Sequence, residues 1–158
     1  MPVQEANEVV ASIIAYARAN AELIALVATD AQTSGPAIFS GDPQSGGSGF
    51  PKVIFEDSLR GLRGTDTEGW LGGRDISPIS CFGSDLPALW ALARKISEVL
   101  NEAYVGGTLD TEHYRVTILR QAGPWRKLKW QQKAQSTGNE LFQLTSDWLL
   151  VYGKKQGA

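Results

Sequence analysis

The sequence has only one cysteine, Cys81, and one histidine, His113, among 158 residues. A single cysteine excludes an intramolecular disulfide framework and a multi-cysteine zinc site, and a single histidine argues against a metal held by imidazole ligands. No run of 18 apolar residues is present, and the acidic start MPVQEANEVV lacks the basic region of a signal peptide. We therefore expect no metal or other cofactor, no membrane segment, and synthesis in the cytoplasm.

The sequence also lacks the motifs of common enzyme classes. The glycine-rich residues 46–49 lack the lysine of a phosphate-binding P-loop, and Ser48 lacks the second following glycine of a nucleophile elbow. Cys81 falls on an expected strand, where a lone cysteine is usually a small buried hydrophobe rather than a nucleophile paired with His113. No spacing selects two carboxylates as an acid–base pair. We expect no catalytic residue and no enzyme, with a paired-acid site as the enzymatic alternative.

Length and composition are those of one soluble domain spanning residues 1–158. Hydrophobic residues make up 42% and charged residues 20% of the chain, which is ordinary for a globular protein of this size. The formal net charge is −2 at pH 7, so the molecule as a whole is not attracted to nucleic acid. Any interaction with a polyanion must come from a local concentration of basic residues.

Apolar periodicity predicts two main helices and one short one. The first starts after Asn7, with Val10, Ile13, Ile14 and Ala17 on one face. Asn20 is the expected cap of the short second helix. The clearest helix covers residues 86–100, is capped by Ser84 or Asp85, and ends before Gly106. Its one-sided apolar stripe, which includes Trp90, predicts that it covers a sheet.

Alternating apolar residues predict five extended segments at 37–40, 52–57, 74–82, 114–119 and 141–152. Pro78 lies within the third segment and favours an edge position or a bulge. The resulting fold class is α+β, with a mostly antiparallel sheet of four to five strands and two main helices packed on one face. Long flexible loops are expected at about 41–50, 58–73 and 123–138, because these stretches have little apolar periodicity.

One stretch differs from the rest of the acidic chain. Residues 113–139 contain no acid and carry six of the fifteen basic residues, with Tyr114, Trp125 and Trp130 between them. Cations interleaved with aromatics fit a protein partner, a solvated surface, or a nucleic acid, where they pair with phosphates and stack on bases. The partner-contact residues that we expect from this stretch and from the loop at 58–73 are Arg60, Arg63, Trp70, Trp125, Arg126, Lys127, Lys129 and Trp130.

Several segments resemble one known family. Residues 20–27 at the end of the helical start, residues 50–56, residues 76–84 before the long helix, and residues 147–152 near the end carry the likeness. Together they resemble the tail terminator, or tail-completion, proteins of long-tailed phages and prophages. The loops at 58–73 and 123–138 are longer than in compact members of that family.

The resemblance implies a structural virion protein without catalysis. It implies a homohexameric ring at the head-proximal end of the tail tube, which stops tube polymerisation and meets the head connector or neck proteins. Genomic DNA would pass through the ring lumen, and assembly would take place in the bacterial cytoplasm. A head-completion or neck adaptor protein is the alternative, followed by a nucleic-acid-binding module that uses the basic stretch at 113–139.

Overall fold

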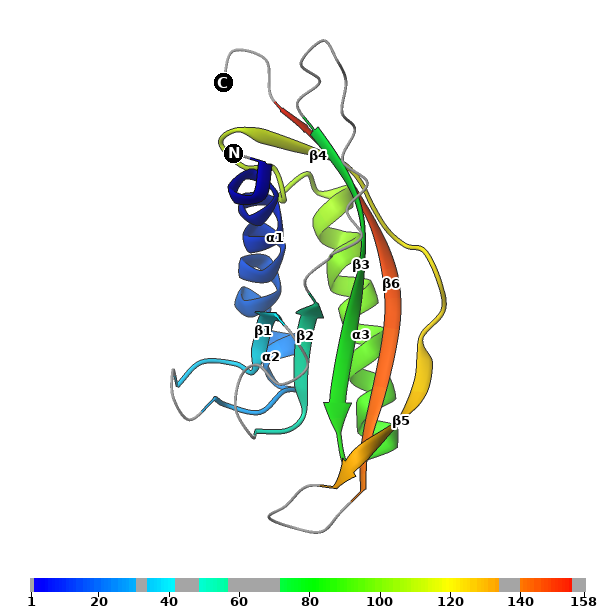
Figure 1. The fold of residues 1–158 in the computed structure, drawn as a ribbon. Helices are drawn as coiled ribbons and strands as arrows, with labels where there is room; N and C mark the ends of the chain where they lie inside the picture. The colour runs from blue at the N-terminus through cyan, green and yellow to red at the C-terminus, as the bar shows by residue number, and fades with distance from the viewer. Residues whose placement is uncertain (1, 31–33, 42–48, 57–71, 134–139, 155–158) are drawn as a thin grey trace.

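A mixed six-stranded sheet runs through the structure, a computed structural model of the chain (Figure 1). The structure describes residues 2–30, 34–41, 49–56, 72–133 and 140–154, and of residues 2–7, 72–77, 129–133, 140 and 154 it describes the backbone only. The strands are β1 (Ile38–Gly41), β2 (Lys52–Glu56), β3 (Gly72–Gly83), β4 (Tyr114–Gln121), β5 (Arg126–Lys133) and β6 (Glu140–Lys154). Their order is β1-β2-β3-β6-β4, with β5 also paired to β6, and only β1 and β2 run parallel.

The helices are α1 (Pro2–Ala19), α2 (Ala21–Ile24) and α3 (Leu86–Val105). The expected caps are confirmed, since Asn20 accepts from the Leu23 amide and Asp85 accepts from the Ala88 amide. The first helix begins at Pro2 and not after Asn7. Proline suits a first helical turn because its missing N–H has no partner to lose there. Neither α1 nor α3, nor any other helix in the described part of the chain, has the length and apolar character to cross a bilayer.

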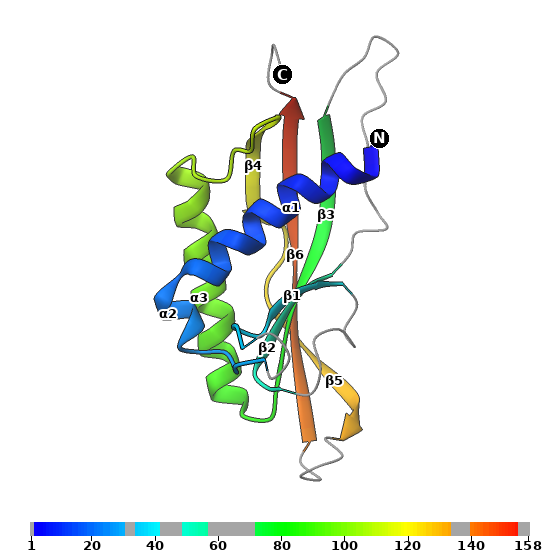
Figure 2. The same ribbon diagram turned by 90° about the vertical axis from the view of Figure 1, so that its left-hand side faces the viewer.

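Both long helices cover the same face of the sheet. Figure 2 shows α1 crossing in front of the strands at an angle, beside α3. The core lies between the two layers, where α3 buries its apolar stripe against alternate residues of β3, β4 and β6. The β6 residues that face the helices are Phe142, Leu144, Trp148, Leu150 and Tyr152. The predicted α+β class and its helices on one face are therefore confirmed.

The position of β3 in the sheet differs from the sequence prediction. The third strand is interior rather than at an edge, because Ile79–Phe82 pair with both β2 and β6. Pro78 has a described strand partner only in β6, at Asp147, because the pairing with β2 ends at Ile79. The proline therefore lies where β3 leaves its second neighbour, which is a tolerated position for a residue without an N–H.

The predicted loop at 123–138 contains strand β5. Its sequence RKLKWQQK has no stripe of apolar residues, so periodicity alone did not predict it. The strand forms because β4 and β5 run along the same edge of β6, as one interrupted arm of a long hairpin. Hydrogen bonding to the long β6 strand thus orders a segment that buries little apolar surface of its own.

Candidate functional site

The sheet edge formed by β4 and β5 carries three arginines in an ordered row. Successive side chains of a strand point to opposite faces, so Arg115 and Arg120, five residues apart, would lie on opposite faces of a regular strand. A bulge between Val116 and Ile118 adds one residue and brings both arginines to the face away from the helices. Gln121 pairs with Trp148 and Arg126 pairs with Thr145, so the four residues between Gln121 and Arg126 lie opposite only two residues of β6. Because Thr145, Leu149 and Gly153 lie on the same face of β6, Arg126 lies on the same face as Arg115 and Arg120.

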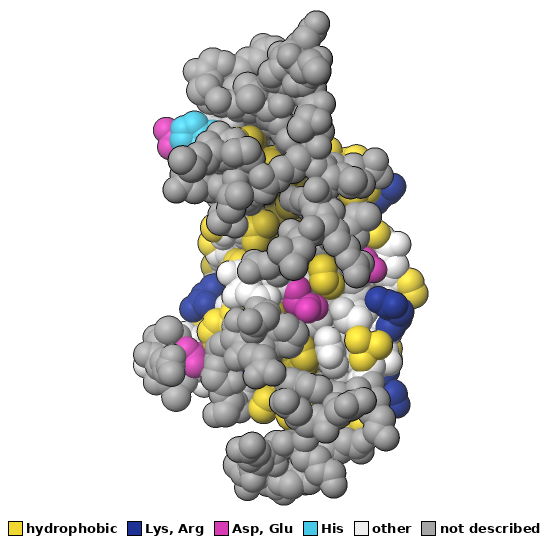
Figure 3. Space-filling view, viewed as in Figure 1, with side chains coloured by type: hydrophobic (Ala, Val, Ile, Leu, Met, Phe, Trp, Pro, Cys, Tyr) yellow, Lys and Arg dark blue, Asp and Glu magenta, His cyan; other side chains and the backbone are white. Residues whose placement is uncertain are grey.

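We call Arg115, Arg120 and Arg126 the arginine row. Their partners in β6 are Gly153, Leu149 and Thr145, respectively. These partners are four residues apart, so the arginines are spaced by about 13 Å along the edge. All three are exposed, and Figure 3 shows Lys and Arg side chains along the right-hand margin, the side on which β5 lies in Figure 1. The edge therefore presents regularly spaced positive charge on a rigid sheet.

Apolar and acidic side chains share this surface with the arginine row. The register places Ile118 and Leu128 on the same face, and Leu128 is 41% exposed. Asp147 lies 3.8 Å from Arg126, and Asp110 lies 3.9 Å from Arg115, distances at which exposed ion pairs are weak. A surface that mixes arginine, exposed leucine and a carboxylate resembles a protein-contact surface more than a purely cationic track for phosphates.

The turn between β4 and β5 is held by hydrogen bonds directed inward. The Ala122 amide donates to the Asp147 carbonyl at 2.7 Å, and the Ser146 hydroxyl donates to the Gly123 carbonyl at 2.7 Å. The Trp125 indole donates to the Ser97 hydroxyl of α3 at 2.9 Å. Trp125, which the sequence predicts as a partner-contact residue, is half-buried against the core. It anchors the turn, and with Trp90 it lines an open hollow of about 560 Å³.

Replacing Ser97 with alanine is expected to lower the free energy of unfolding by about 1 kcal/mol. The half-buried Trp125 N–H loses its acceptor, and the better helix propensity of alanine offsets only part of that cost. Urea unfolding of the S97A variant measures the change. Ser97→Thr keeps the hydroxyl and is the matched control, and an S97A variant as stable as the wild type would show that this bond does not hold the turn.

The structure assembles only part of the predicted contact set. Arg60, Arg63 and Trp70 lie outside the described residues, and Lys129 and Trp130 lie on β5 with only their backbone described. The exposed Lys127 points to the helix side, with its ammonium 5.9 Å from the centre of the Phe142 ring. Of the eight residues, only Arg126 has a described side chain in the arginine row. Arg115 and Arg120 belong to the predicted basic stretch but not to the predicted contact residues, because the bulge that aligns them has no signature in the sequence.

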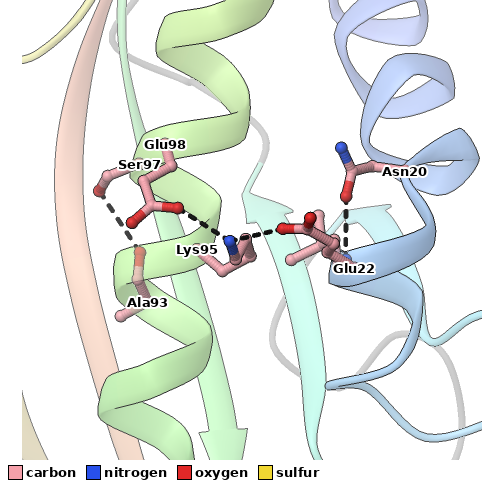
Figure 4. Close-up of polar contacts among 7 residues, drawn as sticks. Asn20, Glu22, Ala93, Lys95, Ser97 and Glu98 are labelled. Atoms are coloured by element: carbon pink, nitrogen blue, oxygen red, sulfur yellow. Dashed lines mark hydrogen bonds and ion pairs between the residues drawn. The ribbon is translucent and has the colours of Figure 1, made fainter.

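A second charged surface, of opposite sign, lies between α2 and α3. The Lys95 ammonium donates to Glu22 at 2.7 Å and to Glu98 at 2.9 Å, as Figure 4 shows. The hydrogen bond and charge of Lys95 lower the pKa of Glu22, and the two carboxylates raise the pKa of Lys95. Exposed Glu102 adds a third carboxylate to the same hollow of about 260 Å³. We call Glu22, Lys95, Glu98 and Glu102 the acidic helix surface.

Cys81 and His113, the two residues considered as a nucleophile and its base, have different surroundings and different partners. Cys81 is fully buried between Val53 and Leu144 of the neighbouring strands, and burial raises the pKa of its thiol. The exposed His113 instead contacts Glu8 of α1 at 3.2 Å. Within the described residues, no group of three or more His, Cys, Asp or Glu side chains could hold a metal ion.

Comparison with known proteins identifies a likeness of fold alone. No family model matches the chain, and no curated protein matches it. A solved structure described as the virion of a native gene transfer agent (GTA) particle contains a chain with a TM-score of 0.59 and 17% sequence identity. The likeness covers 90% of this chain and 92% of that chain. The two chains therefore share a fold along nearly their whole lengths.

Proposed function

We propose that this chain is a structural protein of a phage-like virion, and specifically a tail terminator. In this role it forms a homohexameric ring at the head-proximal end of the tail tube, ends tube polymerisation and joins the tail to the head connector. It is assembled in the cytoplasm of a bacterial host, and genomic DNA passes through the ring lumen. It needs no cofactor and catalyses no reaction.

The observation that carries the proposal is the end-to-end likeness to a chain of the gene transfer agent virion. That likeness spans nine-tenths of both chains, so it concerns the whole domain and not a common substructure. Fold likeness at 17% identity supports membership in a virion but does not select a position within it. The tail terminator role rests in addition on the resemblance of residues 20–27, 50–56, 76–84 and 147–152 to that family.

The distribution of charge supports ring formation. A ring needs a heterologous contact, in which one surface of each copy meets a different surface of the next. The arginine row and the acidic helix surface provide two such surfaces with opposite signs on one chain. We also retain Arg60, Arg63, Trp70, Lys127, Lys129 and Trp130 as proposed contact residues for the neighbouring copies and the tube.

A capping experiment tests this function. Purified protein is mixed with polymerising tail tubes, and tube length and tube ends are examined by negative-stain electron microscopy. The proposal predicts shorter tubes with a six-fold ring on one end. A protein that stays monomeric at high concentration and leaves the tubes uncapped contradicts it, whereas a ring that binds the head connector but not the tube supports the neck adaptor alternative.

A further inference from the structure

The two surfaces are opposite in net charge. The arginine row carries three positive charges beside two carboxylates, Asp110 near Arg115 and Asp147 near Arg126, which leaves a net charge of +1. The acidic helix surface carries three carboxylates around one ammonium, which leaves a net charge of −2. The described partners of the row lie at 3.8–3.9 Å, so its charges are only weakly neutralised within the chain.

The arginine row also has an exposed apolar side chain beside its charges. Of the four large hydrophobic residues that are exposed in the described part of the chain, Leu128 lies on the face of the arginine row. Apolar contacts beside complementary charges are typical of protein interfaces, where arginine is enriched. A DNA backbone would match the arginines but not Leu128 or Asp147.

We infer that the arginine row of one copy docks on the acidic helix surface of a second copy of this chain. The inference rests on the proposed ring and assigns the contact that closes it. The row lies on the sheet face away from the helices, and the acidic surface lies on the helix layer, so one copy can use both surfaces at once. A contact between two different surfaces repeats from copy to copy and closes a ring when the rotation allows.

The contact depends on features that are built into the fold. The bulge in β4 keeps Arg115 and Arg120 on one face, and the Trp125–Ser97 bond holds the turn that precedes Arg126. On the other surface, Lys95 holds Glu22 and Glu98 together, which leaves Glu102 as a carboxylate without an ion-pair partner among the described residues. Both surfaces are therefore largely organised before they meet, which reduces the entropic cost of docking.

A charge exchange between the surfaces tests the inference. The first variant carries Arg120→Glu and Arg126→Glu, and the second carries Glu98→Lys and Glu102→Lys, which keeps the Glu22–Lys95 pair. Each variant alone places like charges across the contact and is expected to raise the concentration needed for ring assembly at least tenfold. An equimolar mixture restores opposite charges at every contact of an alternating ring and is expected to recover assembly, as is a chain that carries all four substitutions.

Assembly is measured by sedimentation velocity and by tube capping, and thermal unfolding verifies that each variant folds. Glu112→Lys reverses an exposed carboxylate outside the acidic helix surface, and this control is expected to assemble as the wild type does. If either variant alone forms rings, the assigned contact is wrong, although the proposal that the chain forms a ring still holds. If the mixture does not recover assembly, the arginine row does not dock on a second copy of the chain.

Two further outcomes separate this inference from its alternatives. If the Arg120→Glu, Arg126→Glu variant forms normal rings but loses salt-sensitive retention of double-stranded DNA, the row binds a polyanion and the inference is wrong. If the wild-type protein neither forms rings nor caps tubes, the proposed function fails, and the inference fails with it. The wild-type measurement therefore distinguishes failure of the function from failure of the assigned contact.

Discussion

Replacing Trp148 with alanine is expected to lower the free energy of unfolding by about 3–5 kcal/mol. Trp148 is 4% exposed and lies on β6, the strand that pairs with β3, β4 and β5. Its side chain belongs to the core between the sheet and the helices. Removing it leaves a cavity that the surrounding rigid strands cannot fill, and urea unfolding measures the loss.

Trp148→Phe is the matched control for this substitution. The buried Trp148 indole Nε1 has no hydrogen-bond partner within the described part of the chain. A buried donor without a partner costs about 1–3 kcal/mol, so removing it offsets much of the lost packing. We expect Trp148→Phe to change the free energy of unfolding by less than about 1.5 kcal/mol. Equal losses for phenylalanine and alanine would contradict this account of the site.

Deleting Thr117 is expected to lower the free energy of unfolding by only about 1–3 kcal/mol and to leave the faces of β4 unchanged. Thr117 is the extra residue of the bulge between Val116 and Ile118, whose partners Tyr152 and Val151 are consecutive in β6. Its removal therefore converts the bulge to regular pairing, in which Arg115 and Arg120 stay on one face. The cost is the loss of two hydrogen bonds, from the Tyr104 hydroxyl to the Thr117 carbonyl and from the Thr117 hydroxyl to the Val151 carbonyl. Urea unfolding measures the loss, and ring assembly is expected to persist.

Thr117→Ala separates loss of the bulge from loss of the side chain. The Thr117 hydroxyl donates to the Val151 carbonyl at 3.1 Å on the exposed edge, so its removal is expected to cost about 1 kcal/mol or less. A deletion variant that loses ring assembly, or that is more than about 3 kcal/mol less stable than Thr117→Ala, would contradict this account. Such a result would mean that β4 does not close into regular pairing and that Tyr114 and Val116 leave the core.

The parts of the fold with strong local patterns were predictable from the sequence. Helix α3 combines an N-cap at Asp85, a proline in the first turn and a continuous apolar stripe, and all three act on the same segment. In β6, the apolar residues Phe142, Leu144, Trp148, Leu150 and Tyr152 recur on the face that packs on the helices. In both elements, local preference and burial agree, so periodicity alone finds them.

The parts that depend on pairing with a distant strand were not predictable. The β5 strand has no buried stripe and is ordered by β6, so its sequence resembles a loop. The bulge that gathers the arginines is a property of the register between β4 and β6, which no single segment encodes. The role of Trp125 in anchoring the turn could not be predicted, because its acceptor, Ser97, lies on a different element. The arginine row lies in the basic stretch that the sequence singles out, but only Arg126 of the predicted contact residues has a described side chain in it.

The most direct test of the central claim is cryo-electron microscopy of the virion that contains this chain. The account predicts six copies in a closed ring between the tail tube and the neck, with the arginine row of each copy against α2 and α3 of the next. A chain found as a single copy, placed in the head shell, or absent from purified particles would contradict it.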